Sequence, residues 1–430
     1  MPKKTTPTPF FTAALLILSI VLMPRCAAQV HTNNALQINP NQFEGTDVQR
    51  IQAAIDAANG TTNSIVIPAR NANGTNLWLL DSAILVPSNM TILLDNCTLQ
   101  LSNNCRDNMF RSSNVGFGIT DPMWNRNIHI IGIGDAYLKG ATNPRATGDG
   151  HRQLTLDPET EKKAGNWRVS YGSDTGKEGI KQKGDWRNIM ILMGYVDGFK
   201  LKNVTIEKPH AWAVSFERTS NAEISNIRFD CPEKQIVNGK EVFVANRDGI
   251  DLRHGCKNFR IDNISGVTGD DFIALSTLGI YSENPEGGNI NSTMVTSRTW
   301  HGPEDDTEQI FITNIVCKSS TRAVAIRAND VASINNVFID GVMFNGGYNA
   351  MLIGGKGYGH DSKPGKINNI HAMNIIGDGE SLLQIEEAIA DSSFSNGVYK
   401  GSGDQLVKYN KIDAAETSNI ILNNVIKLKK

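Results

Sequence analysis

The chain has 430 residues, 40% of them hydrophobic, and its 42 lysines and arginines nearly balance its 44 aspartates and glutamates. A length of this order suits two or three average domains, but extended all-β folds often use it as one body. The balanced charge gives no reason to expect a nucleic acid partner or a general role at a membrane surface. Any recognition based on charge must therefore be local.

The N-terminal segment differs from the rest of the chain. Two lysines precede an apolar run from Phe10 to Met23, and small residues before Gln29 suit cleavage there. The run is too short to span a membrane comfortably. Residues 1–28 are therefore predicted to be a signal peptide, and 29–430 a single domain; an uncleaved anchor is the alternative. We expect the mature protein to be secreted or periplasmic, free of the membrane and monomeric.

Five cysteines remain after that segment, at Cys97, Cys105, Cys231, Cys256 and Cys317. Their odd number prevents complete intramolecular pairing. Spacing makes Cys97 with Cys105, and Cys231 with Cys256, plausible disulfides in an exported protein, while buried free thiols suit a large core equally well. No CxxC spacing or histidine cluster indicates zinc, so neither a metal nor a cofactor is predicted.

A short pattern of alternating apolar residues, usually leading to Asn, returns along the chain. Its copies begin at Phe199, Ala222, Phe259, Ile310, Val337 and Ile370. The starts lie 23, 37, 51, 27 and 33 residues apart. Alternation within each copy indicates strands, and a minimum spacing with variable additions is typical of a coil whose turns carry loops.

No long helices with apolar periodicity lie between these strands, which argues against a TIM barrel or a doubly wound sheet. Stacked parallel strands remain, with Asn side chains at equivalent turns able to form hydrogen-bonded ladders. The sequence therefore predicts an all-β fold, a single-stranded right-handed parallel β-helix. Two long polar stretches, Gly148 to Gly184 and Leu278 to Glu308, are predicted to be loops that shape a binding site.

A capping helix is predicted near the N-terminus, because the first coil of a solenoid otherwise exposes its core and strand edges. Thr46 and Gln49 have the spacing of a capping box, and Asn59-Gly60 is a stop signal. Between them lies an apolar stripe for core packing, formed by Val48, Ile51, Ile55 and Ala58.

Three carboxylates stand out at Asp248, Asp270 and Asp271. Asp248 and Asp270 are 22 residues apart, close to the shortest repeat, so we expect them at matching positions on neighbouring coils, roughly 4.8 Å apart. Like charges gathered in this way should raise at least one pKa. A protonated carboxyl can then donate to a glycosidic oxygen while an ionised neighbour activates water, as in inverting glycoside hydrolysis. A solvated turn is the alternative for the Asp pair.

The NRDG and GDD stretches that hold these aspartates resemble the Asn-Thr-Asp-Gly and Gly-Asp-Asp motifs of the polygalacturonase-like enzymes, glycoside hydrolase family 28. That family has the right-handed parallel β-helix of the pectin lyase-like superfamily. The resemblance implies Asp270 as general acid, Asp248 and Asp271 as the groups that activate water, and Asn246 as a substrate-positioning residue. Trp212 falls where family members often have an aromatic residue near the cleft, although a packing role is the alternative.

Two further family motifs are missing. Arg322 stands where the family has the histidine of Gly-His-Gly, and Leu352-Ile353-Gly354 replaces Arg-Ile-Lys. Ordinary polygalacturonase specificity is therefore not expected. Other cations are candidates to bind the carboxylate or sulfate of an acidic glycan, with solvated side chains as the alternative for each. These candidates are Arg247, Arg322, Arg327 and Lys356.

The sequence thus predicts an exported glycoside hydrolase that acts on a plant-type or algal-type, acidic polysaccharide or oligosaccharide by inverting catalysis. Its partner would be a carbohydrate and not a nucleic acid. Two alternatives stay open: a polysaccharide lyase on the same fold, which commonly needs a cationic base and Ca²⁺, and a glycan-binding β-helix without catalysis. If the loop from Leu278 to Glu308 covers one end of the cleft, cleavage at chain ends would be favoured over cleavage within a polymer.

Overall fold

The computed structural model describes residues 37–105, 107–116, 118–142, 186–237, 239–244, 246–278, 294–297, 300–328, 331–354 and 366–428. Residues Gln37–Lys430 form one compact unit. Three predictions fall outside the described residues: the signal peptide, the loop from Gly148 to Gly184, and the role of Lys356. Among the helices of the described ranges, none has both the length and the apolar character needed to cross a membrane.

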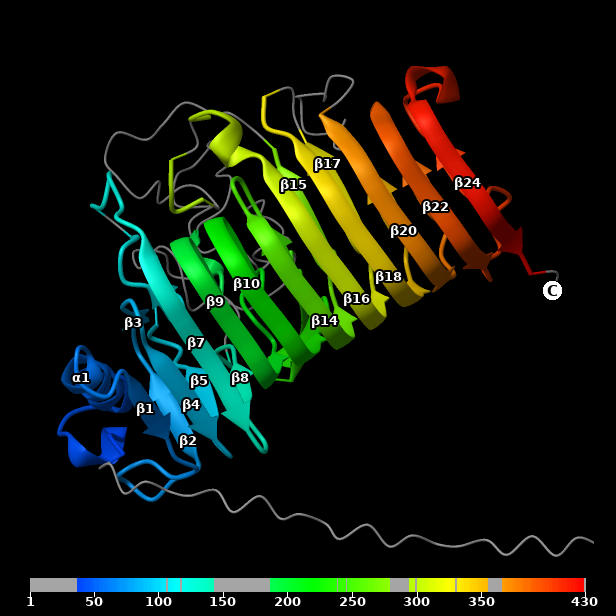
Figure 1. The fold of residues 1–430 in the computed structure, drawn as a ribbon. Coiled ribbons are helices and arrows are strands. Elements are labelled where there is room, and N and C mark those ends of the chain that lie inside the picture. The colour runs from blue at the N-terminus through cyan, green and yellow to red at the C-terminus, as the bar shows by residue number, and fades with distance from the viewer. Residues whose placement is uncertain are drawn as a thin grey trace, which may run out of the picture. The chain divides into compact units, whose positions relative to one another are not determined.

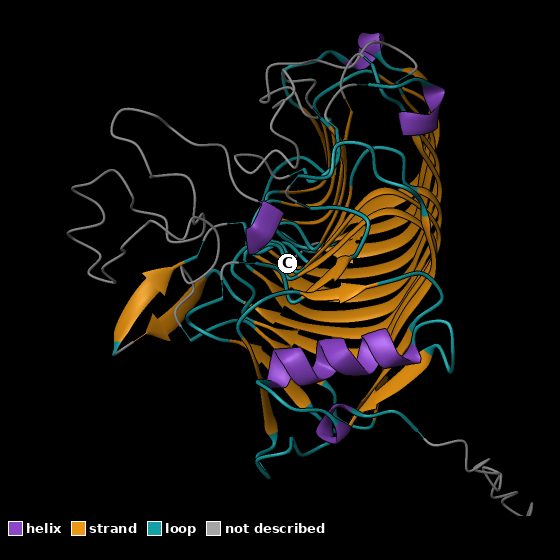
Figure 2. Ribbon diagram, turned by 90° about the vertical axis from the view of Figure 1, so that its left-hand side faces the viewer, coloured by secondary structure: helices purple, strands orange, loops and turns teal. Residues whose placement is uncertain are grey.

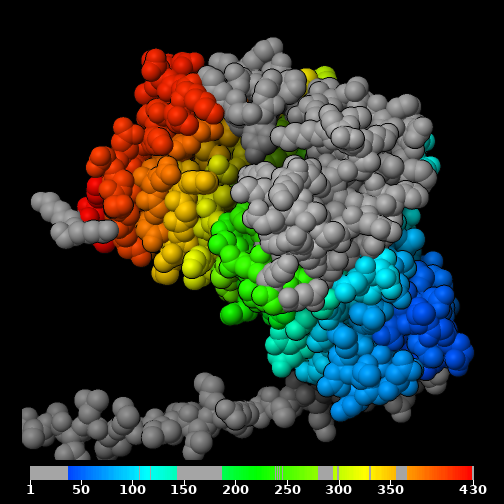
Figure 3. Space-filling model, turned by 180° about the vertical axis from the view of Figure 1, so that it is seen from behind, coloured from blue at the N-terminus to red at the C-terminus, as the bar shows by residue number. Residues whose placement is uncertain are grey.

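Successive turns of the chain stack into a coil of parallel strands, which confirms the predicted parallel β-helix. In the described parts of the chain, twenty-two strands belong to one continuous sheet, and the coils follow one another in chain order from blue to red (Figure 1). The same order is visible on the surface from the opposite side (Figure 3). The fold is therefore quasi-one-dimensional, with each coil in contact with the coil before it and the coil after it.

The strands form three columns that run along the coil. The first column, which we call the site column, consists of β3 (Ile84–Val86), β6 (Phe110–Ser112), the first parts of β9 (Ile191–Glu207) and β10 (Val214–Cys231), β13 (Ile250–Leu252), β15 (Ile273–Thr277), β17 (Arg322–Ala328), β19 (Asn349–Ile353), β21 (Ser381–Ile385) and β23 (Val407–Tyr409). The second consists of β1 (Ser64–Ile67), β4 (Thr91–Asp95), β7 (Asn125–Ile133), the middle of β9 and β10, β14 (Lys257–Thr268), β16 (Thr307–Ser319), β18 (Ile334–Gly346), β20 (Ile367–Gly377), β22 (Ile389–Tyr399) and β24 (Ser418–Lys427).

The third column starts with β2 (Leu77–Leu80), β5 (Thr98–Leu101) and β8 (Tyr137–Lys139), and continues in the ends of the long strands. Outside the columns, β11 (Lys234–Val237) and β12 (Lys240–Phe243) form an antiparallel hairpin. Short 3₁₀ helices occur at η1 (Pro40–Gln42), η2 (Trp186–Asn188), η3 (Pro303–Asp305) and η5 (Ala414–Glu416).

The six repeat copies found in the sequence lie in register with one another. Their first residues are consecutive partners across β9, β10, β14, β16, β18 and β20. Alternate side chains of each copy point into the coil, where Phe259 packs edge-to-face on Phe216, and Phe216 on Phe199. The apolar residues that alternate in the sequence therefore mark the inner face of the second column, and the residues between them mark its outer face.

Asn residues form the predicted ladders where the long strands bend. Asn203, Asn226 and Asn263 have φ of 57°, 57° and 53°, in the left-handed region that Asn tolerates better than most residues. The Asn226 amide donates to Asn203 Oδ1 at 2.8 Å, and the Asn263 amide donates to Asn226 Oδ1 at 2.8 Å. Each Asn side-chain oxygen in the ladder thus accepts a hydrogen bond from the Asn amide of the next coil.

Helix α1 (Asp47–Ala58) confirms the predicted cap. It lies across the first coil (Figure 2), with Val48, Ile51, Ile55 and Ala58 buried together with Ala54. The backbone N–H of Thr46 donates to Gln49 Oε1 at 2.9 Å, as the capping box requires.

The structure decides between the two readings of the cysteines. All five cysteines among the described residues are buried, and neither plausible disulfide is formed. Cys97, Cys231, Cys256 and Cys317 have pKa values raised mainly by burial, which keeps them protonated. They act as small apolar core residues.

Candidate active site

The three aspartates lie where the chain enters strands β13 and β15 of the site column. Ile250 pairs with Ile273, so Asp248 matches Asp271 and not, as the sequence spacing suggested, Asp270. The reason is local: Asp270 belongs to the turn that precedes the strand. The hydrogen bond from Gly249 N to Asp271 O at 3.0 Å supports this alignment.

The matched position continues along the coil and gathers further predicted residues. Ala213 N donates to Asp248 O, and Phe272 N donates to Arg322 O, so one row runs from Trp212 through Asp248 and Asp271 to Arg322. Neighbouring members of the row are one coil apart, roughly 4.8 Å. The fold therefore places side chains far apart in the sequence next to one another.

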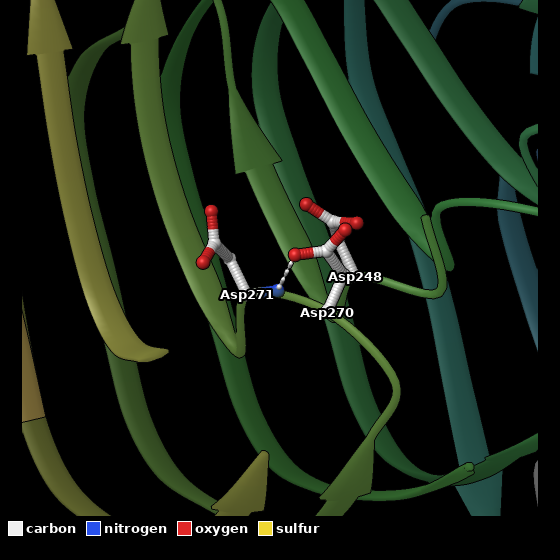
Figure 4. A group of neighbouring side chains, drawn as sticks. All are labelled: Asp248, Asp270 and Asp271. Carbon is white, nitrogen blue, oxygen red and sulfur yellow. Dashed lines mark hydrogen bonds between the residues drawn. The ribbon is translucent and has the colours of Figure 1, made fainter. Parts of the chain in front are cut away.

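The three carboxylates converge. One oxygen from each of Asp248, Asp270 and Asp271 lies within 4.8 Å of the others. Asp248 and Asp271 are buried and Asp270 is half-buried. Figure 4 shows the group, with the Asp271 backbone N–H donating to Asp270 Oδ1 at 3.1 Å.

The NRDG motif has a structural explanation in this turn. A Cβ at Gly249 would stand 2.4 Å from the carbonyl oxygen of Phe272, so only glycine allows the two coils to approach this closely. Asn246 is half-buried and has φ of 56°, in the left-handed region. Both residues thus shape the turn that presents Asp248.

Asp271 is held as an ionised carboxylate. Its Oδ1 accepts from Thr321 Oγ1 at 3.0 Å and from Arg322 Nη1 at 3.1 Å, and its Oδ2 lies 2.7 Å from Arg327 Nη2. Burial acts to raise its pKa, but Arg327 and Arg322 outweigh burial and hold the pKa below its ordinary value. Two predicted cations, Arg322 and Arg327, therefore do reach the site.

The other two carboxyls keep their protons more tightly. Burial, and then the charge of Asp271, raise the pKa of Asp270 to about 6, against the opposing effects of Thr321, Arg327 and Arg322. Burial, and then Asp251, Asp270 and Asp271, raise the pKa of Asp248 well above its ordinary value. Environment thus separates three chemically identical groups into one ionised and two proton-holding members.

Arg247 does not face this group. Its side chain is fully buried, and its guanidinium donates to Pro209 O at 2.8 Å, to Pro232 O at 2.7 Å and to Gln235 Oε1. Burial lowers its pKa to about 10. Its bonds tie the hairpin β11–β12 to the coil, so this arrangement does not suit the predicted substrate contact.

Trp212 has the packing contacts weighed for it, and its contact with substrate stays a prediction. Its half-buried ring packs against the apolar cluster of Val115, Trp186, Ile189, Leu192 and Val295. The Arg253 guanidinium carbon lies 4.9 Å from the ring centroid, within range of a cation–π contact. Its Nε1 is buried and makes no hydrogen bond with any described residue.

The described parts of the predicted loop from Leu278 to Glu308 are anchored beside the site. Glu217 accepts from Val295 N at 2.9 Å, and from Thr296 N and Oγ1 at 2.8 Å and 2.6 Å. Arg218 forms a paired contact with Asp305 at 2.7 Å and 2.9 Å. These buried contacts fix residues 294–297 and η3 on the edge of β10.

Sequence reasoning missed four side chains that surround the aspartates, namely Ser215, Asp251, Arg253 and Thr321. Asp251 is 2% exposed and Ser215 is fully buried, and the two are register partners on β13 and β10. Thr321 could have been found from its place directly before Arg322. The other three carry no motif signal, because their importance comes only from the stacking of coils.

The aspartate group is also the one place in the described residues where acidic side chains come close enough to share a cation. Carboxylate oxygens suit Ca²⁺ or Mg²⁺. Both oxygens of Asp271, however, already accept from Thr321, Arg322 and Arg327, which would compete with such an ion. We assign no metal to the site.

Neighbouring carboxyls with separated pKa values suit the acid and base steps of glycosidic-bond cleavage, and the comparisons agree. The family model described as glycosyl hydrolases family 28 matches residues 155–379, more than half of the chain. The protein belongs to this family and is a glycosidase. No protein of curated function matches the sequence.

Solved structures show the same fold at low sequence identity. A hyperthermoactive exopolygalacturonase from Thermotoga maritima is 14% identical, with 90% of this chain and 91% of that chain covered and a TM-score of 0.53. A polygalacturonase from Erwinia carotovora ssp. carotovora is 16% identical, with 90% and 95% covered and a TM-score of 0.52. A tailspike protein mutant of E. coli bacteriophage HK620, in complex with a hexasaccharide, is 11% identical, with 92% and 64% covered and a TM-score of 0.51.

Proposed function

We propose that the protein is an exported hydrolase that cleaves glycosidic bonds in a pectin-like polysaccharide, using Asp248, Asp270 and Asp271. The observation that carries the proposal is the convergence of the three carboxyl oxygens within 4.8 Å in a chain of family 28. The signal-peptide pattern of residues 1–28 supports export. An exported β-helix with such a triad meets its substrate outside the cytoplasm.

Asp270 is the general acid in this proposal. It is the most exposed of the three carboxyls, and its pKa of about 6 leaves it protonated in mildly acidic solution. A protonated carboxyl next to the bond can donate its proton to the leaving oxygen as the bond breaks. The negative charge of Asp271, adjacent in the chain, helps Asp270 to keep that proton until it is needed.

Asp271, the ionised member of the group, takes a proton from the attacking water, and Asp248, which holds its own proton, orients that water by hydrogen bonding. A carboxylate offers about four acceptor positions, so Asp271 can accept from a water as well as from Thr321, Arg322 and Arg327. Covalent attack by Asp271 would require it to break its ion pairs, whereas Asp248 holds a proton and is a poor nucleophile. The arrangement therefore favours water as nucleophile and inversion at the anomeric carbon.

The oxygen spacing makes the stereochemistry a decisive measurement. Inverting enzymes usually separate the two carboxyl groups by about 6.5–9.5 Å and retaining enzymes by about 5–5.5 Å. Here one oxygen from each carboxyl lies within 4.8 Å of the others, nearer to the retaining spacing, while the bonding of Asp271 favours inversion. Proton NMR of the first-formed reducing end decides the matter: inversion gives the anomer opposite to the bond cleaved.

The test of function uses the purified mature protein on pectic glycans of differing charge. Reducing ends and unsaturated products are measured together. Hydrolysis releases reducing ends without an absorbing double bond, whereas a lyase produces both. Activity that appears only with added Ca²⁺, together with unsaturated products, would establish the lyase alternative. Glycan binding without products, unchanged in Asp270→Asn, would establish a glycan-binding protein.

A further inference from the structure

Several buried polar atoms next to the catalytic group, Arg322 Nε among them, have no hydrogen-bond partner among the described residues. Four of them lie on the two coils that carry β10 and β13: Trp212 Nε1, Ser215 Oγ, Asp248 Oδ1 and Asp251 Oδ2. Trp212 and Ser215 come from the coil of β10, and Asp248 and Asp251 occupy the matching positions on the coil of β13. The four atoms therefore belong to one small area on the outer face of the site column.

Such a concentration calls for an explanation. A buried polar atom without a partner loses its hydrogen bonds to water and gains nothing in return, so folded proteins contain few of them. Ser392, a buried serine on β22, is satisfied: its Oγ donates to Ala390 O at 2.6 Å and accepts from Ile370 N at 3.0 Å. The contrast with Ser215, together with the place of the four atoms beside the aspartates, favours a polar ligand as their partner.

We propose that Trp212, Ser215, Asp248 and Asp251 bind an uncharged, hydroxyl-bearing sugar residue at the bond to be cleaved, with Ser215 and Asp251 as its positioning pair. This inference rests on the proposed hydrolase function and names the kind of sugar that the site accepts. The four atoms offer both donors and acceptors, as the hydroxyl groups of a sugar require.

The charges around these atoms favour a sugar without a carboxylate. Asp248 and Asp251 face the same space, and a uronate there would bring a carboxylate into a buried setting where the loss of water disfavours a charge. Arg322 and Arg327 already bind Asp271, and Arg253 lies over the Trp212 ring. A neutral sugar avoids this desolvation cost, which also accounts for the missing Arg-Ile-Lys motif at residues 352–354.

Asp251 suits the role of a hydrogen-bond donor. It is 2% exposed, and burial raises its pKa well above the ordinary value, with Asp271 and Asp270 adding to the rise and Arg253 opposing it. A carboxyl that keeps its proton can donate to one sugar oxygen and accept from another hydroxyl. The neighbouring Ser215 hydroxyl, on the adjacent strand, can do the same.

Variants of the pair separate positioning from a structural role. Ser215→Ala and Asp251→Ala should each lower kcat/KM about tenfold or more, chiefly through KM, because each removes a bond to the sugar. Each should lower the urea midpoint less than the loss of a satisfied buried hydrogen bond does, since Ser215 Oγ and Asp251 Oδ2 have no partner among the described residues. Asp251→Asn should recover part of the activity, because an amide can also donate and accept. Ser392→Ala is the matched control: it should lower the midpoint and leave KM unchanged.

The sugar class is tested with polygalacturonate and with the same polymer after chemical reduction of its carboxylates to primary alcohols. Calorimetric binding to Asp270→Asn and hydrolysis by the natural protein should both favour the reduced polymer, and Ser215→Ala should remove that preference. Preference for polygalacturonate, or equal binding by natural protein and Ser215→Ala, overturns the inference while leaving hydrolase function intact. Binding without hydrolysis of either polymer or any pectic glycan would instead refute the hydrolase function.

Discussion

The Asn ladder of the second column and the aspartate row of the site column are built on the same geometry with different side chains. In the ladder, Asn203, Asn226 and Asn263 stand one coil apart, and each amide donates to its neighbour. In the row, Asp248 and Asp271 also stand one coil apart, but a carboxylate only accepts. Stacking that satisfies amides therefore sets carboxylates against one another.

The protein relieves this conflict in two ways. Arg322 and Arg327 neutralise Asp271, whereas Asp248 and Asp270 retain protons. The comparison teaches that stacking of coils only brings equivalent side chains close together. Side chains that can both donate and accept then stabilise the fold, whereas side chains that only accept have shifted pKa values that suit catalysis. The predictions below concern either the aspartate row or the Asn ladder, so that each can be tested separately.

The largest effect is expected for Asp270→Asn, which keeps the shape of the side chain and removes its transferable proton. General acid catalysis is worth about 10²–10⁴-fold, so kcat should fall by about a thousandfold. Circular dichroism and the melting temperature should stay close to those of the natural protein. A variant with more than a tenth of the natural rate would contradict the assigned role.

A large loss of stability is expected for Arg327→Gln. The Arg327 and Asp271 side chains are 5% and 4% exposed, and removal of one partner of a buried pair costs about 3–5 kcal/mol. Urea unfolding at pH 7 measures the change. Arg322→Gln is the matched control, because its side chain is 22% exposed and its removal should cost much less. Equal midpoints for the two variants would show that burial does not distinguish the pairs.

The pH profile of kcat/KM should report the proton on Asp270. Because the acid must be protonated, activity should fall as pH rises through about 6. Asp271 must be ionised, and its lowered pKa places the acid-side loss below its ordinary range. In Arg322→Gln both limbs should move to higher pH, since this cation lowers the pKa of both carboxyls. A profile that stays fixed in this variant would rule out control by Asp270 and Asp271.

The smallest effect is expected for Asn226→Asp, which converts one rung of the ladder into a carboxylate like those of the site. The new side chain can still accept from Asn263 but can no longer donate to Asn203, a loss of about 1 kcal/mol. Differential scanning calorimetry should show a small decrease in melting temperature, and kcat/KM should not change. An unchanged melting temperature at pH 7 would mean that the ladder bond contributes nothing.

The sequence was most informative where local pattern and global fold agree. Alternation and Asn spacing located six strands in their true register, and the stripe of α1 predicted its buried face. The sequence predicted that the three aspartates lie together, but it paired Asp248 with Asp270 instead of Asp271. In a Gly-Asp-Asp run, the sequence does not show which aspartate belongs to the turn and which precedes the strand. Pattern inside one segment predicts that segment well.

Contacts between coils were beyond the reach of such patterns. Arg247 lies inside the recognised motif, yet its partners are Pro209, Pro232 and Gln235, which no spacing rule connects to it. Ser215 and Asp251 became notable only through their pairing across β10 and β13 and through their unpartnered atoms. Burial and hydrogen bonding depend on what stacks above and below, and the linear sequence does not state this.

The anchoring of residues 294–297 by Glu217 has a consequence for protein engineering. Strand β15 ends at Thr277 and β16 begins at Thr307, so the extra length lies after both reactive turns and not between them. The chain between these strands can be exchanged as a cassette, provided that its replacement supplies two backbone N–H groups to Glu217 and a carboxylate to Arg218. The surroundings of the site could then be reshaped for new sugars while the distance between Asp248 and Asp271 stays set by strand pairing alone.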